Sequence, residues 1–78
     1  MPTILRIGPY RFHFYSDERN EPPHIHVATT DGECKFWLEP VQLARNKGLP
    51  PHMLREIERL IFEHLEFLKE KYNEYHNN

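Results

Sequence analysis

The sequence predicts an α+β fold, with short antiparallel strands in its first half and a long amphipathic helix in its second half. Three observations support this prediction: alternating apolar side chains before residue 40, turn residues that group them into pairs, and apolar residues at helical spacing after residue 50. We therefore expect residues 1–78 to form a single domain. In it, a four-stranded antiparallel sheet made of two β-hairpins within residues 1–40 packs one face against the helix.

The first predicted hairpin joins residues 3–7 to residues 10–15 through the dipeptide Gly8-Pro9. Glycine at the first central position is what a two-residue type II′ turn requires. This turn places Arg6 directly opposite Arg11. Like charges at opposed positions repel each other, which modestly favours an anion or a carboxylate nearby, whereas a solvated face is the simpler interpretation.

The second predicted hairpin joins residues 24–30 to residues 33–39. Its dipeptide Asp31-Gly32 is a strong signal for a two-residue turn, and Pro40 ends the second strand. The register that follows from such a turn pairs His24 with Glu39, His26 with Trp37, and Val27 with Phe36.

The second half of the chain is predicted to be helical. Residues 41–47 are expected to form a short helix that ends at Gly48. A long helix is expected over residues 50–75, because a proline suits its first turn and its apolar residues recur every three or four positions. These apolar residues are Leu54, Ile57, Ile61, Leu65, Leu68, Tyr72 and Tyr75.

One helix can cover only one face of the sheet, so the other face is expected to be exposed. The alternation places basic, imidazole and aromatic side chains on it, although the net charge of the chain is −2. Such a face suits phosphate contacts and base stacking on single-stranded RNA. Its residues are Arg6, Arg11, His13, Tyr15, His24, His26, Lys35 and Trp37.

The size and composition of the chain indicate its assembly state and its cellular compartment. A core built from 78 residues is small, so homo-oligomerisation or a tight protein partner is expected to supplement it. Cys34 is the only cysteine, which excludes an internal disulfide and indicates a reducing compartment. No signal peptide and no apolar stretch of about 20 residues is present, so we expect a cytoplasmic protein that does not enter membranes.

His24 and His26 are the most suggestive pair, since residues two apart on a strand point to the same side. Two such imidazoles could share acid and base work at a phosphodiester or chelate a metal ion. A metal site would need a third ligand, for which His13 and Glu39 are the candidates. The simpler interpretation is an exposed strand whose polar side happens to be histidine. We expect neither a metal ion nor another cofactor.

Several segments of the chain resemble a family of short bacterial proteins of unknown function. They are Met1 to Gly8, Phe12 to Ser16, Glu21 to Val27, Lys35 to Pro40, and Arg55 to Glu58. Genes of this family often lie beside a second small gene, in the manner of toxin–antitoxin pairs. The resemblance thus implies a partner protein encoded by a neighbouring gene, and it supplies no established catalytic residues.

Our leading hypothesis is a small toxin-like component that acts on RNA through the exposed sheet face. In it, His24, His26 and Tyr15 are the candidate catalytic residues, with Tyr15 or Trp37 available to stack on a base. The candidate substrate-binding residues are Arg6, Arg11, His13, Lys35 and Trp37. The alternatives are a non-enzymatic antitoxin or protein-binding adaptor, and a His-based metal-binding domain.

Overall fold

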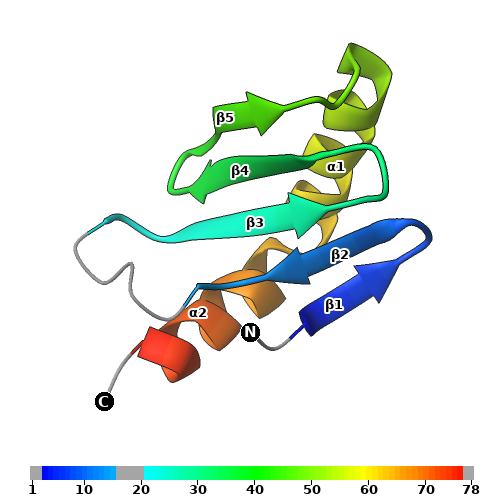
Figure 1. The fold of residues 1–78 in the computed structure, drawn as a ribbon. Helices are drawn as coiled ribbons and strands as arrows, with labels where there is room; N and C mark the ends of the chain where they lie inside the picture. Colours follow the sequence, from blue (N-terminus) through cyan, green and yellow to red (C-terminus); the bar gives the residue numbers. More distant parts are fainter. Residues whose placement is uncertain (1–2, 16–20, 77–78) are drawn as a thin grey trace.

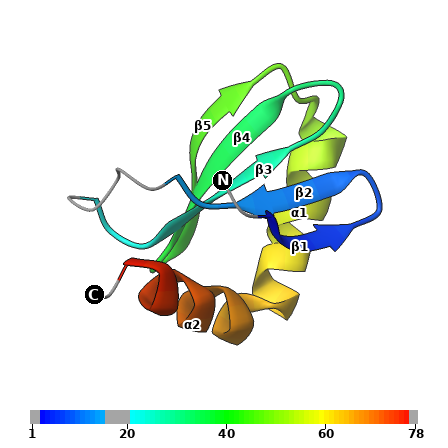
Figure 2. The ribbon, with the colours of Figure 1, turned by 60° about the horizontal axis from the view of Figure 1, so that its bottom comes forward.

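The computed structural model describes residues 3–15 and 21–76. Its strands form one antiparallel sheet in chain order, and its two helices lie on the same face of that sheet (Figures 1 and 2). This confirms the α+β class with an antiparallel sheet. The elements are β1 (Thr3–Ile7), β2 (Tyr10–His13), β3 (His24–Ala28), β4 (Glu33–Leu38), β5 (Val41–Lys47), α1 (Pro51–Glu63) and α2 (Leu65–His76).

The prediction of four strands and a short helix is wrong, because residues 41–47 form the strand β5. β5 pairs along the whole of β4, from Val41 opposite Leu38 to Lys47 opposite Glu33. Without this partner, the mostly buried β4 would be left with one unpaired row of backbone N–H and C=O groups. That pairing requirement outweighs the weak helix preference of the segment.

The first hairpin has the predicted register over most of its length, with Arg6 opposite Arg11. The second does not, because β3 and β4 are joined by the four residues 29–32 and not by a two-residue turn. His24 therefore faces Trp37, and His26 faces Lys35. The shift amounts to two residues, and since side chains alternate with a period of two, every side chain stays on its predicted face.

Gly32 does not lie in the predicted two-residue turn, and its missing side chain matters for a different reason. Positive φ occurs at Gly8 and Gly48 but at no other position among the described residues. A Cβ atom on Gly32 would instead lie 2.2 Å from the carbonyl oxygen of Lys47. Gly32 therefore allows the β3–β4 loop to press against the end of β5.

The helical segment bends at His64, so the single helix predicted over residues 50–75 is two helices. Figure 2 shows α2 running at an angle to α1 beneath the sheet. The change of direction keeps the apolar sides of both helices against the twisted sheet. Ile57, Ile61 and Leu68 are fully buried, as predicted.

The core lies between the helices and the sheet. It comprises Tyr10, Phe12, Phe14, Ile25, Val27, Cys34, Phe36, Leu38, Leu49, Ile57, Leu60, Ile61, Leu68 and Tyr72. The Tyr10 hydroxyl donates a hydrogen bond to Glu56 Oε1 at 2.5 Å, which ties β2 to α1. Burial, followed by this contact with Glu56, raises the pKa of Tyr10 to about 12.

Within the described residues, neither helix is long and apolar enough to span a membrane.

Replacing Gly32 with alanine tests the contact between the loop and β5. The added methyl group meets backbone and not a flexible side chain, so we expect the free energy of unfolding to fall by about 1–3 kcal/mol. Asp31→Ala in the same loop is the matched control, because the Asp31 side chain is exposed; it should stay within about 0.5 kcal/mol of wild type. Urea denaturation measures both. Equal stability of the two variants would contradict the assigned role of Gly32.

Candidate functional site

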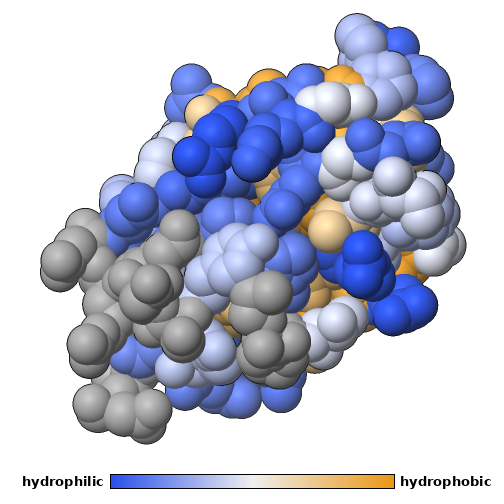
Figure 3. All heavy atoms as spheres, viewed as in Figure 1, coloured by the Kyte–Doolittle hydropathy of each residue, from blue (hydrophilic) through white to orange (hydrophobic). Residues whose placement is uncertain are grey.

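The sheet face turned away from the helices is mostly hydrophilic (Figure 3), but the expectation that its histidines and lysine are exposed is wrong. Only 0% of His24, 2% of His26, 8% of His13 and 8% of Lys35 is exposed. Arg6 and Arg11 are exposed, whereas Tyr15 and Trp37 are half-buried. The imidazoles are buried because they pack against one another and against neighbouring aromatic and acidic side chains.

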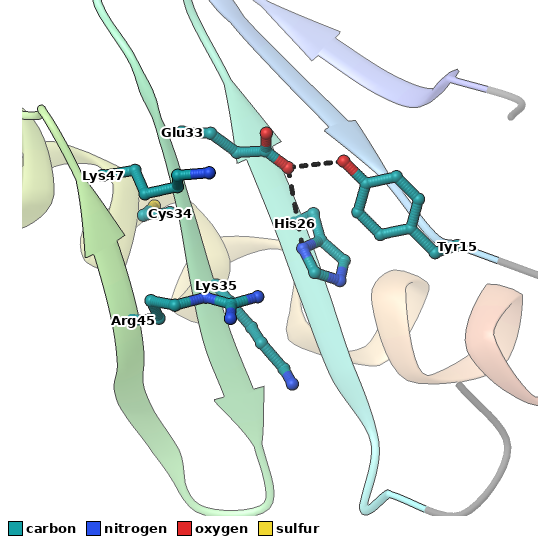
Figure 4. A pocket seen from close by; sticks show the side chains of 7 residues that line it. All are labelled: Tyr15, His26, Glu33, Cys34, Lys35, Arg45 and Lys47. Carbon is teal, nitrogen blue, oxygen red and sulfur yellow. Dashed lines mark hydrogen bonds and ion pairs between the residues drawn. The ribbon is translucent and has the colours of Figure 1, made fainter. Parts of the chain in front are cut away.

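One carboxylate lies at the centre of this face. The Tyr15 hydroxyl donates a hydrogen bond to Glu33 Oε2 at 2.7 Å. The same oxygen lies 3.6 Å from His13 Nε2 and 3.7 Å from His26 Nδ1. Figure 4 shows the Glu33 carboxylate linked to the Tyr15 and His26 side chains. Glu33 was not among the predicted site residues, although the alternation of β4 had placed it on the same face as Lys35 and Trp37.

Neighbouring strands bring these groups together. His13 on β2 lies directly opposite His26 on β3, and their rings stack with centroids 5.7 Å apart. The Tyr15 ring meets both imidazoles edge-on, with centroids 5.0 Å from His13 and 4.3 Å from His26. His13 Nε2 is buried and makes no hydrogen bond within residues 3–15 and 21–76. A buried imidazole nitrogen in this state can accept a ligand contact.

Tyr15 and Glu33 line both of two hollows on this face, and we call this hydrogen-bonded pair the divider. One hollow, of about 250 Å³, contains His26. The other, of about 230 Å³, contains His13. Both hollows include Tyr15 and Glu33 in their walls, and one imidazole lines each hollow.

Two cations of β5 reach the His26 hollow because the pairing of β4 and β5 shifts by one residue between Lys35 and Phe36. Arg45 consequently faces Lys35, and Lys47 faces Glu33. With an unbroken register, Arg45 would face Cys34 on the core side. Bulges of this kind redirect side chains beside functional sites. Neither cation was among the predicted site residues, because residues 41–47 were expected to form a helix and are the strand β5.

The cations around the hollows differ in how they are paired. Lys35 forms an ion pair with Glu21, and its Nζ atom lies 4.7 Å from the centre of the Trp37 ring. Arg11, Arg45 and Lys47 make no ion pair among the described residues. On the helices, by contrast, ion pairs are made by Arg59, Lys69 and Lys71. The hollows are thus bordered by positive charge that is available to an anion.

His24 does not line any of these hollows. Its Nδ1 lies 2.9 Å from the Pro22 carbonyl oxygen, which can only accept, so Nδ1 carries the proton. Its ring packs edge-on against Trp37 and against Tyr72 of α2. The structure therefore brings His13, His26 and Tyr15 together at the hollows and leaves His24 at the end of β3 beside the helix.

Cys34 also borders the His26 hollow. Burial, with a further contribution from the Glu33 carboxylate, raises the pKa of the Cys34 thiol to about 12. The thiol is therefore protonated near neutral pH and is a poor nucleophile there. This agrees with its place in the apolar core.

Within residues 3–15 and 21–76, no group of three or more histidine, cysteine or acidic side chains has an arrangement that could hold a metal ion. Glu39, a candidate third ligand, instead pairs with Lys69 of α2 at 3.5 Å.

Comparison with known proteins places the chain in a family. Residues 10–73 match the model of a domain of unknown function, DUF4160. The match covers most of the chain and includes the divider and both hollow-lining histidines, so the chain belongs to this family. No curated protein and no solved structure matches the chain significantly.

Proposed function

We propose that this DUF4160 member is the RNA-cleaving, toxin-like component of a bacterial two-protein module, with its site at the divider. The proposal is supported by the two stacked imidazoles, because His13 and His26 line two different hollows that share Tyr15 and Glu33. A reaction that needs a base on one side of a phosphate and an acid on the other fits this arrangement.

The chemistry is transfer of a phosphoryl group within the RNA. One imidazole removes the proton from a ribose 2′-hydroxyl, and the resulting oxygen forms a bond to the adjacent phosphorus. The bond from phosphorus to the 5′-oxygen breaks, and the other imidazole, in its protonated form, donates a proton to that oxygen. The products are a 2′,3′-cyclic phosphate and a free 5′-hydroxyl. Glu33 orients both rings, and the nearby cations stabilise the charge on the phosphate.

The size of the hollows supports a preference for single strands with little sequence selectivity. Volumes of about 250 and 230 Å³ are smaller than the roughly 300–1,000 Å³ of pockets that enclose a drug-sized ligand. Each hollow suits a phosphoryl or sugar group, which leaves the bases outside. Backbone contacts carry no sequence information by themselves.

The proposal of a protein partner rests on the gene pairing that the family resemblance implies and on one structural observation. Phe62 at the end of α1 is 58% exposed, and Phe67 on α2 is 37% exposed. This apolar pair lies on the helices, away from the hollows, and could be covered by a second protein. It also favours the alternative function, a non-enzymatic antitoxin or adaptor that binds through its helices.

Alanine substitution of the two histidines tests the proposed chemistry. His13→Ala and His26→Ala should each lower the cleavage rate of single-stranded RNA by about 10²–10⁴-fold, because each removes a proton-transfer group. RNA affinity should change little, since acid and base groups act on the transition state. His52→Ala is the matched control, because His52 is exposed on α1. Cleavage by both site variants at the wild-type rate would refute the proposal.

Expression in bacteria separates the toxin-like role from the adaptor role. We expect induction of the chain alone to arrest growth, and co-expression of the neighbouring gene to relieve the arrest. The His26→Ala chain should not arrest growth at the same expression level. If the wild-type chain is harmless and instead protects cells from the neighbouring protein, the adaptor role is correct.

A further inference from the structure

A third hollow on the same face, of about 390 Å³, lies at the β3–β4 loop. It is adjacent to the other two, because it shares Glu33 and Lys47 with the His26 hollow and shares Arg11, Ala28 and Glu33 with the His13 hollow. Half of its lining residues belong to the loop, residues 29–32, and the neighbouring strand residues Ala28 and Glu33 also line it. The sugar–phosphate backbone of an RNA bound at the divider can therefore extend into this third hollow.

Two cations from different strands meet at this hollow. Arg11 comes from β2 and Lys47 from the end of β5. The close approach of Gly32 to the Lys47 carbonyl oxygen holds the end of β5 beside the loop. The position of the Lys47 backbone is thus set by packing, and its exposed side chain lines the hollow from there.

Two cations and two acids line the hollow, and they are not paired with one another among the described residues. Arg11 lies directly opposite Arg6 in the β1–β2 pair, an arrangement that is unfavourable without an anion. Two acids, Asp31 and Glu33, also line the hollow. Glu33 accepts its hydrogen bond from Tyr15, and neither acid forms an ion pair with Arg11 or Lys47 among the described residues. Both cations therefore remain available to a phosphate.

We infer that this hollow is a second anion subsite, which binds the phosphate next to the one that is cleaved. The inference rests on the proposed function and defines its substrate class: single-stranded RNA in which the cleaved linkage has a charged phosphate on a neighbouring nucleotide. A dinucleotide with one phosphate can reach the divider but leaves this subsite empty. Longer chains are consequently better substrates.

Oligonucleotides with a single ribonucleotide test the inference, because only the linkage after the ribose can be cleaved. The basic substrate is a dinucleotide with a 5′ ribonucleotide and a 3′ deoxyribonucleotide; the longer substrates add one deoxynucleotide at the 5′ or the 3′ end. We expect one of the two additions to raise kcat/KM about tenfold, the effect of one charge-assisted contact. Replacing the added linkage by an uncharged methylphosphonate should abolish the gain.

The Arg11→Ala variant connects this gain to the hollow. In it, the ratio of the kcat/KM values for the longer and the shorter substrate should fall from about ten to near one, while Arg55→Ala, an exposed residue of α1, should keep the ratio. The slope of log kcat/KM against log salt for the longer substrate should decrease by about 0.7 in Arg11→Ala.

The possible failures are distinguishable. If the dinucleotide is cleaved but neither addition raises kcat/KM, or if Arg11→Ala keeps the gain, the second subsite is wrong and the proposed function stands. If none of the substrates is cleaved, the proposed function fails and the subsite fails with it.

Discussion

The arrangement of the sheet face depends on one oxygen atom, Oε2 of Glu33. It accepts the Tyr15 hydroxyl and lies within 3.7 Å of nitrogen atoms of both His13 and His26. Polar rings packed this closely lose hydration. The Glu33 carboxylate lies beside both rings and is held there by its hydrogen bond from Tyr15. It also forms half of the divider.

Backbone features around this centre determine which charges surround it. The bulge between β4 and β5 turns Arg45 and Lys47 toward the site, and the missing side chain of Gly32 lets the β3–β4 loop close against the end of β5. The resulting cations have no acidic partner among the described residues, whereas three cations of the helices do. The sheet face is thereby suited to a polyanion, although the chain as a whole is slightly acidic.

The alternation of side chains made the faces of the strands predictable even where the register was not. His26 stays on its predicted face beside Lys35, because a slip of two residues preserves facing. β5 was not predictable in this way, because residues 41–47 have only a weak strand preference of their own. They form a strand by pairing with β4. The burial of the histidines was missed for a related reason. Glu33, Tyr15 and the imidazoles cover one another, and such mutual packing depends on contacts between strands and not on periodicity within one.

The most direct test of this account is the Glu33→Gln variant, assayed for both cleavage and binding of single-stranded RNA. Glutamine keeps an oxygen that can accept from Tyr15 but removes the negative charge beside the imidazoles. We expect the cleavage rate to fall at least about 100-fold and the RNA affinity to equal or exceed that of wild type, because a charge that repels phosphate is gone. Cleavage within a few-fold of wild type would contradict the central place given to the Glu33 carboxylate.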